Sequence, residues 1–307
     1  MVKIGVIGLG DIAGKAYLPV LSGHEGIEIH LLSRNKVVLA AAGNKYRFEN
    51  LHHTLDSLIH SGIKAAFVHT ATTAHYGIVK ILLEHDIHVL VDKPVTLDYY
   101  SSKTLFDLAE SRNLTLMAGF NRRYAPVYQK LKELPNPSMI IMQKNRHALP
   151  SEVRSFIFDD FIHVVDTLRY LFPYPVDQLL VNGMKKDNLL YQVTIQFLSD
   201  NGATAIGIMN RDSGTTEEKV EVFSSSEKRV VNNVSELFVH KGTNVSRIGS
   251  SDWESMLHKR GFEQMINDFL QALDSGTVPK ISGKDALLTH EMCETIVGRL
   301  KEQLKLA

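Results

Sequence analysis

The opening of the chain constrains its fold more than any other stretch. "KIGVIGLGDIAG" is an apolar run, then a glycine-rich turn, then the start of a helical pattern. Gly8, Gly10 and Ala13 have the spacing G-x-G-x-x-A, which combines a tight turn, close approach of backbone to a pyrophosphate, and close helix–strand packing. We therefore predict a dinucleotide-binding turn that also includes Asp11 and Ile12. A glycine turn without a ligand would show the same letters.

The pattern of a strand followed by a helix then repeats. Apolar strands are predicted at residues 27–33, 65–71, 87–91 and 114–120, with helical spacing between them. Repeated units of this kind form right-handed crossovers in a mostly parallel, doubly wound sheet. We predict an α/β fold whose first domain, residues 1–120, is a Rossmann domain.

Beyond residue 120 the pattern changes to helices followed by clustered strands. "YQVTIQF" alternates apolar residues with Gln192, Thr194 and Gln196, which is typical of an antiparallel strand with one covered face. Residues 121–307 are predicted to be an α+β domain with an open, mostly antiparallel sheet. The predicted helices cover residues 121–134 and 159–172 and two C-terminal segments, and further strands are predicted at 203–209 and 219–224.

Composition argues against several classes of partner. Lys and Arg total 34 and Asp and Glu total 34, so no net charge favours nucleic acid or an anionic membrane. No apolar run approaches the length of about 18 residues that a membrane span needs. The single cysteine, Cys293, excludes a disulfide framework within the chain and fits a reducing compartment. We expect a cytoplasmic globular protein.

The end of the second predicted strand bears on the choice of cofactor. NAD sites usually place Asp or Glu there, to accept from the ribose 2′-hydroxyl. This chain has Ser33 and Arg34 instead, and a hydroxyl with a guanidinium suits a 2′-phosphate better. The prediction is NADP ahead of NAD, with NAD still possible. The alternative is that Arg34 is a solvated loop charge.

Two further strand ends carry polar residues at the edge where parallel sheets bind ligands. "HTATTAH" places Thr70, Ala71 and His75 there as predicted cofactor contacts, although its other threonines could simply cap the next helix. "VDKP" places Asp92, a further predicted cofactor contact that could orient Lys93 or a ribose, and Lys93 at the end of the following strand. A lysine at that position can donate to a substrate oxygen or take its proton.

Pro94 stiffens the backbone immediately after that lysine, and we expect a cis Lys93–Pro94 bond. The tripeptide Asp–Lys–Pro alone would be read as an ordinary turn.

The predicted helix "DDFIHVVDTL" carries a polar stripe of Asp159, His163 and Asp166 at i, i+4 and i+7. An acid one turn from a histidine can fix its tautomer and raise its basicity, as general acid–base catalysis requires. Asp160 is a rival for that role, and a satisfied buried histidine is the alternative. No second histidine sits at ligand spacing on this helix, so no metal site is predicted.

Together these motifs resemble the Gfo/Idh/MocA oxidoreductase family over nearly the whole chain. "GVIGLGDIAG", "DKP", "GFNRRYAP" and "DDFIHVVD" carry the resemblance, and their detail is similar to the MviM branch. The resemblance implies a Rossmann domain followed by an open antiparallel sheet. It places the family's Glu–Lys–Pro motif on Asp92, Lys93 and Pro94, and its Asp-x-x-x-His pair on Asp159 and His163.

The resemblance also implies the activity, which is hydride transfer between a nicotinamide and a carbinol carbon of a sugar, polyol or related small molecule. Lys93 and His163 would share proton transfer, with the base left open between them, and Asp159 would orient His163. A homodimer or homotetramer is expected, paired through the face of Gln192 and Thr194. The alternative function is a non-catalytic dinucleotide-binding sensor on the same fold.

Overall fold

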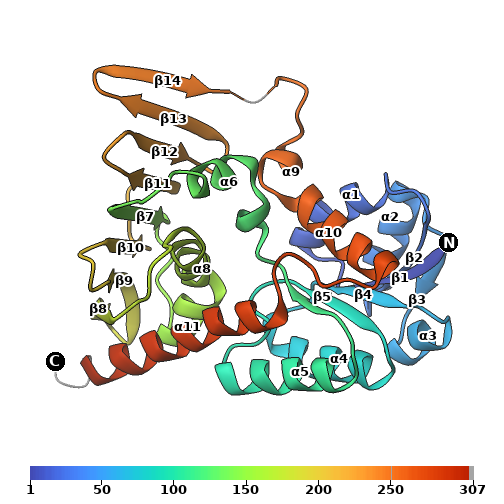
Figure 1. Cartoon of the computed structure of the whole chain (residues 1–307). Coiled ribbons are helices and arrows are strands. Elements are labelled where there is room, and N and C mark those ends of the chain that lie inside the picture. The colour runs from blue at the N-terminus through green and yellow to red at the C-terminus, as the bar shows by residue number, and fades with distance from the viewer. Residues whose placement is uncertain (250, 304–307) are drawn as a thin grey trace. The chain divides into compact units, whose positions relative to one another are not determined.

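The computed structural model describes residues 1–249 and 251–303, and Figure 1 traces the chain by colour. The chain forms two compact units. The first consists of Met1–Gly119 and Phe262–Leu288, and the second of Phe120–Gly261 and Thr289–Ala307. Within the described residues, no helix is both long and apolar enough to cross a bilayer.

The first unit is built on a six-stranded parallel sheet in the order β3-β2-β1-β4-β5-β6. This order places β1 at the centre, between β2 on one side and β4 on the other, as in a doubly wound dinucleotide-binding sheet. The predicted Rossmann domain is confirmed. The strands are β1 (Val2–Ile7), β2 (Ile27–Leu32), β3 (Asn50–His52), β4 (Ala65–Val68), β5 (His88–Val91) and β6 (Leu116–Ala118).

Helices connect these strands. Two elements were not expected from the sequence, and one expected helix has an irregular first turn. The short β3 and the helix after it were not predicted, because three strand residues are too few to show periodicity. The helix after the glycine turn begins as a π-helix, η1, and continues as α1, with Pro19 at its start. The helices are η1 (Ala13–Tyr17), α1 (Leu18–Leu21), α2 (Lys36–Tyr46), α3 (Leu55–His60), α4 (Thr72–Glu84) and α5 (Tyr99–Ser111).

A segment from late in the chain completes the first unit. Helix α10 (Phe262–Ser275) contacts η1 and α1, and its Phe269 meets Phe67 of β4 edge to face, with ring centroids 5.3 Å apart. From the sequence, this segment is expected in the second domain, residues 121–307. The strongly apolar face of α10 predicts that this face is buried, but it does not indicate which of the two hydrophobic cores the helix covers.

The second unit is built on an eight-stranded sheet in the order β14-β13-β12-β11-β7-β10-β9-β8. Only the β7–β10 pair is parallel, so the predicted open, mostly antiparallel sheet is confirmed. The strands are β7 (Met139–Asn145), β8 (Gln178–Lys186), β9 (Leu189–Leu198), β10 (Thr204–Asn210), β11 (Glu217–Phe223), β12 (Lys228–Asn232), β13 (Glu236–Lys241) and β14 (Asn244–Ile248).

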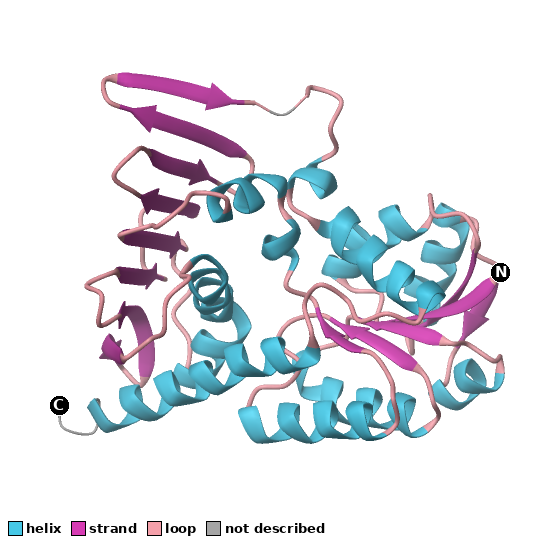
Figure 2. Ribbon diagram, viewed as in Figure 1, coloured by secondary structure: helices cyan, strands magenta, loops and turns pink. Residues whose placement is uncertain are grey.

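One face of this sheet packs against helix α8 (Ile162–Leu171), which contacts β7 and β10. Val193 and Ile195 of β9 are fully buried on that face. Gln192 and Thr194 point the other way and stay partly exposed, as the alternation predicted. In Figure 2 the described helices of the second unit lie on one side of its magenta strands.

The remaining helices show how local sequence interrupts a helix. The predicted helix over 121–134 is a 3₁₀ turn followed by α6, because Pro126 forces Ala125 out of helical geometry, with ψ at 124°. The helices are η2 (Asn121–Tyr124), α6 (Pro126–Lys132), α7 (Val153–Ser155), the π-helix η3 (Phe156–Phe161), α9 (Met256–Lys259) and α11 (Gly283–Gln303), of which α11 begins in the first unit.

Candidate active site

The glycine turn after β1 has the geometry that its sequence predicted. Gly8 has a φ of +87°, and a Cβ there would lie 2.7 Å from the amide nitrogen of Thr70. Only glycine fits, because both the backbone conformation and the contact with β4 exclude a side chain. A Cβ on Gly10 would meet no atom within 4 Å, so the backbone at that residue faces open space.

A cavity of about 880 Å³ opens at this turn, at the carboxyl ends of β1, β2 and β4. Its volume lies within the range of about 300–1,000 Å³ of small-molecule and cofactor sites. Six predicted cofactor residues are among its lining. The lining residues are Ile7, Gly8, Gly10, Leu32, Ser33, Arg34, Asn35, His53, Thr54, Leu55, His69, Thr70, Ala71, Thr73, Ala74 and Ile78.

A second cavity of the first unit, about 1020 Å³, lies at the opposite edge of the sheet. Its lining includes Val2, Ile27 and His88, which begin their strands. Parallel α/β sheets bind ligands beyond the carboxyl ends of their strands, so the smaller cavity is the candidate site.

At the end of β2, Ser33 is partly buried and Arg34 is exposed. The Ser33 hydroxyl accepts from the Asn35 amide at 3.2 Å, and the Asn35 side chain caps α2. Among the described residues Arg34 has no ion-pair partner, so its guanidinium is available to an anion in the cavity. No acidic side chain is present at these positions to accept from a ribose diol.

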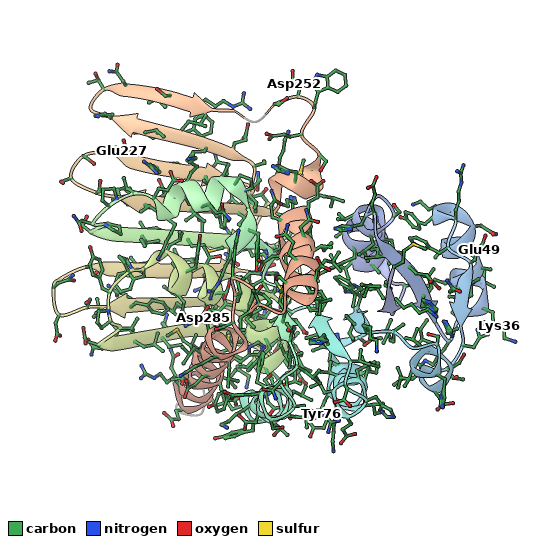
Figure 3. All side chains as sticks on the ribbon, turned by 45° about the vertical axis from the view of Figure 1, so that its right-hand side comes forward. Lys36, Glu49, Tyr76, Glu227, Asp252 and Asp285 are labelled. Atoms are coloured by element: carbon green, nitrogen blue, oxygen red, sulfur yellow. The ribbon has the colours of Figure 1, made fainter. Side chains whose placement is uncertain are left out.

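At the end of β4, His69 and Thr70 line the cavity, while His75 lies behind them. The His75 ring nitrogens are each 3.0 Å from a carbonyl oxygen, one of Thr70 and one of Pro94. His75 is 1% exposed, and the next residue, Tyr76, points outward from α4 (Figure 3). The ring therefore ties the end of β4 to the turn after β5.

That turn holds Asp92, Lys93 and Pro94, and the Lys93–Pro94 bond is cis, as expected. Asp92 accepts a hydrogen bond from the Tyr17 hydroxyl at 3.1 Å. Burial raises the pKa of Asp92, an effect that the neighbouring Lys93 charge partly offsets. Burial, together with the Asp92 charge, also raises the pKa of Tyr17 well above 10.

The second unit contains a buried charge cluster that includes a predicted catalytic residue. Arg122 donates to both carboxylate oxygens of Glu218, at 2.7 and 2.6 Å, and Tyr128 donates to the same carboxylate at 2.6 Å. Burial alone would raise the pKa of Glu218, but the charge and hydrogen bonds of Arg122 lower it to about 2. Arg122 also lies 2.7 Å from Nδ1 of His163.

Two acids near His163 in the sequence, Asp160 and Asp166, have cationic partners. Asp160 binds Lys144 and, at 3.0 Å, Arg146, which together hold its pKa well below the usual range despite burial. Burial and the Arg122 charge lower the pKa of Lys144 to about 7. Asp166 forms a paired hydrogen bond with Arg123, so it has a structural partner.

Comparison with known proteins identifies the family of both units. Residues 2–120 match the model of an oxidoreductase family with an NAD-binding Rossmann fold, Gfo/Idh/MocA, and residues 126–242 match the YceM-like C-terminal domain. YceM of Salmonella typhimurium, which carries the name of an oxidoreductase, is 30% identical over 305 residues, covering 96% of this chain and 96% of that protein. The chain belongs to the Gfo/Idh/MocA oxidoreductase family.

Solved structures of Gfo/Idh/MocA proteins agree. A dehydrogenase (MviM) from Clostridium difficile has a TM-score of 0.93 and 32% identity, covering 97% of this chain and 99% of that one. A family oxidoreductase from Vibrio cholerae has a TM-score of 0.92 and 31% identity, covering 99% and 100%. By sequence alone, a myo-inositol 2-dehydrogenase of Thermotoga maritima is 23% identical over 314 residues, covering 92% of this chain and 91% of that protein.

As a Gfo/Idh/MocA oxidoreductase, the chain uses a nicotinamide dinucleotide, and the cavity fits one. The Gly8 turn and the open backbone at Gly10 suit a diphosphate. His69 and Thr70 supply buried polar atoms that have no hydrogen-bond partner among the described residues. Unpartnered polar atoms in a cavity wall are what a polar ligand satisfies.

Sequence reasoning missed four functional candidates of this Gfo/Idh/MocA chain. His69 had a weak signal, since a histidine ending an apolar strand is unusual. Arg122 lies in the motif GFNRRYAP, but nothing in the sequence indicated its partners, and Lys144 and Glu218 had no signal: the Arg122–Glu218 contact joins residues 96 positions apart. Asp92 stands where the family motif has Glu, and the Tyr17 hydroxyl donates a hydrogen bond to this shorter side chain.

Proposed function

We propose that this oxidoreductase transfers a hydride between the nicotinamide of NADP(H) and a carbinol carbon of a sugar, polyol or related small molecule. The observation that carries the proposal is one edge of the first sheet. That edge combines the cavity at the Gly8 turn with the Lys93–Pro94 turn after β5. When bound, the nicotinamide supplies or accepts the hydride. The name of the myo-inositol dehydrogenase relative supports a polyol-like substrate.

Oxidation of a carbinol also releases the hydroxyl proton, which a side chain must accept. Arginine only donates, so the Arg122 contact requires the acceptor form of Nδ1 in His163 and leaves the proton of the neutral ring on Nε2. His163 is then a donor that polarises the substrate oxygen. This tautomer favours Lys93 as the group that takes the proton.

Asp159 remains proposed to orient His163. Asp11, Ile12, Ala13 and His75 remain proposed as parts of the cofactor site. His75 would act by holding the carbonyls of Thr70 and Pro94 in place.

The preference for NADP is proposed from Ser33 and Arg34. An unpaired guanidinium beside a hydroxyl can bind a 2′-phosphate with charge-assisted hydrogen bonds. NAD lacks that phosphate, so it would lose those contacts and keep the rest.

Titration of the purified protein with NADPH and NADH, followed by nicotinamide fluorescence, tests this proposal. We expect NADPH to bind at least about tenfold more tightly, the effect of one charge-assisted contact. Arg34→Ala should remove the difference, whereas Lys36→Ala, whose side chain points away from the sheet in Figure 3, should keep it. Tighter NADH binding would refute the NADP preference, and binding of neither would refute the proposed oxidoreductase activity.

A substrate screen over sugars, polyols and their carbonyl derivatives would then follow NADPH formation or consumption. The homo-oligomeric state and the cytoplasmic location also remain proposals. The first rests on the uncovered face of the second sheet, where Gln192 and Thr194 lie.

A further inference from the structure

His69 is a buried polar residue that the proposed mechanism does not use. It directly follows β4, lines the cavity, and is 5% exposed. Both of its ring nitrogens, and the hydroxyl of the adjacent Thr70, lack a hydrogen-bond partner among the described residues. Burying such groups unsatisfied is unfavourable, and most buried polar groups in proteins are paired.

Among the described residues, the surroundings of the ring offer it no hydrogen-bond partner. The Tyr17 ring packs against it at a tilt of 33°, with centroids 3.8 Å apart, and the Tyr17 hydroxyl donates to Asp92 instead. Burial lowers the pKa of His69 to about 3, so the imidazole is neutral near pH 7. A neutral imidazole has one donor nitrogen and one acceptor nitrogen, and both are unused here.

The strand order indicates which part of a dinucleotide this residue would meet. β1 and its Gly8 turn lie between β2, followed by Arg34, and β4, followed by His69. With the 2′-phosphate of the adenosine half on the β2 side and the diphosphate at the turn, the β4 side receives the nicotinamide half. The next strand, β5, leads to Lys93.

We propose that His69 and Thr70 form a subsite for the nicotinamide-side ribose of the cofactor, an inference that rests on the proposed function. A ribose hydroxyl both donates and accepts, which matches the neutral imidazole and the threonine hydroxyl. A phosphate only accepts, so it would leave the acceptor nitrogen of His69 unsatisfied. The subsite acts on NADP and NAD alike, because it does not touch the 2′-phosphate.

The test uses variants that remove the polar atoms and keep the shapes. His69→Phe keeps a ring to pack against Tyr17, Thr70→Val keeps the size of the threonine, and His69→Asn keeps one donor and one acceptor. The probes are NADPH, NADH and adenosine 2′,5′-bisphosphate, which lacks the nicotinamide half. Binding is measured by calorimetry and, for the reduced cofactors, by fluorescence.

We expect His69→Phe to weaken NADPH and NADH by about tenfold each, the loss of about one hydrogen bond to a buried partner. Thr70→Val should weaken both cofactors similarly, and His69→Asn should restore part of the affinity. Binding of adenosine 2′,5′-bisphosphate should stay within about twofold in every variant. Without cofactor, His69→Phe should unfold at an equal or higher temperature than the parent, since an unsatisfied polar ring is removed.

Unchanged cofactor affinity in both His69→Phe and Thr70→Val would overturn the inference and leave the proposed function standing. Equal losses for the fragment and the whole cofactor would overturn it too, because the residues would then act on the adenosine half or on the fold. If the parent protein binds neither NADPH nor NADH, the proposed function fails and the subsite fails with it. A His69→Phe variant that does not fold leaves Thr70→Val to decide the outcome.

Discussion

At the scale of single residues, the two candidate catalytic side chains have different kinds of support. Lys93 lies just after a buried strand and forms the cis peptide bond with Pro94, so the backbone fixes its position. His163 is placed by a side chain, Arg122, which Glu218 holds in a buried paired contact. Loss of Lys93 should therefore affect chemistry, whereas loss of Glu218 should first affect folding.

Lys93→Ala is expected to lower turnover by about 10²–10⁴-fold, the range for loss of a general acid or base. Cofactor affinity should change by less than about threefold, since the cavity lining does not include Lys93. Steady-state rates on the screened substrate and fluorescence titration with NADPH measure the two effects. Lys103→Ala is the control, because Lys103 lies on α5 and pairs only with exposed groups such as Asp107. Normal turnover in Lys93→Ala would refute the assignment.

Glu218→Gln should lower the free energy of unfolding by about 3 kcal/mol, because it leaves the buried Arg122 charge uncompensated. Glu221→Gln is the control on the same strand and opposite face. Glu221 pairs with Lys219 and Lys228, both of them more exposed, and should cost at most about 1 kcal/mol. Urea unfolding monitored by circular dichroism compares the two variants. Equal losses of unfolding free energy would show that the buried Arg122–Glu218 pair contributes no more than the pairs of Glu221.

The same pair predicts how stability depends on pH. Folding lowers the pKa of Glu218 from 4.5 to about 2, so its contribution is present above about pH 4.5 and is lost as the pH falls through 2. Glu218→Gln should show a shallower loss of stability than the parent over that interval. Parallel curves for the two proteins, from urea unfolding between pH 2 and pH 6, would contradict the assigned shift.

At the scale of elements, short sequence signals decide how each strand and helix ends. Pro126 splits a predicted helix in two, and Gly8 makes the strand–helix turn after β1. The two glycines of that turn serve different purposes. Gly8 is required by the fold, since its φ of +87° and its contact with Thr70 exclude a Cβ, whereas Gly10 faces open space.

Gly10→Ala should therefore fold normally and bind cofactor poorly. We expect its melting temperature to stay within about 3 °C of the parent, while NADPH and NADH affinities both fall by about tenfold or more because the methyl group occupies the approach to the diphosphate. Gly77→Ala is the matched control, because Gly77 also lies in the first unit and has no atom near its Cβ position. This variant should keep both the melting temperature and the cofactor affinity of the parent. Full cofactor affinity in Gly10→Ala would place the diphosphate elsewhere.

At the scale of the whole molecule, the chain forms two units that carry different sites. The cofactor cavity lies entirely in the first unit, and the Arg122–Glu218 cluster lies entirely in the second. The second sheet also has a face that the described helices of its unit leave uncovered (Figure 2). Thr194 of β9 and Ile208 of β10 are directly paired on this face, and both are partly exposed.

This face should pair with a second copy of the chain. Size-exclusion chromatography with light scattering is expected to give a dimer or tetramer, and Ile208→Glu should shift it to monomer because it places charges in an apolar contact. NADPH binding should be unchanged, since the substitution is in the other unit. Ile81→Glu, at an exposed position on α4, is the control. A monomeric parent protein would refute the expectation.

The parallel character of the first sheet, the mostly antiparallel character of the second and the position of the cofactor turn could all be predicted from the sequence. Those features depend on short-range signals: alternation along strands, helical spacing between them, and glycines at a strand end. The placement of Ser33, Arg34 and Thr70 at the cavity followed as well, because carboxyl ends of neighbouring parallel strands share one edge. The pairing of Asp159 with His163, which depends on side-chain direction, stays a prediction.

Which distant side chains meet could not be predicted, because such contacts form only when the chain folds. The contacts of Arg122 with His163 and Glu218 join residues 41 and 96 positions apart, and no periodicity reports such a pair. The unsatisfied state of His69 and the packing of Phe262–Leu288 with the first unit also depend on what lies around them in space. Burial and partnership are properties of the folded chain, and they set the charge states on which the proposed chemistry depends.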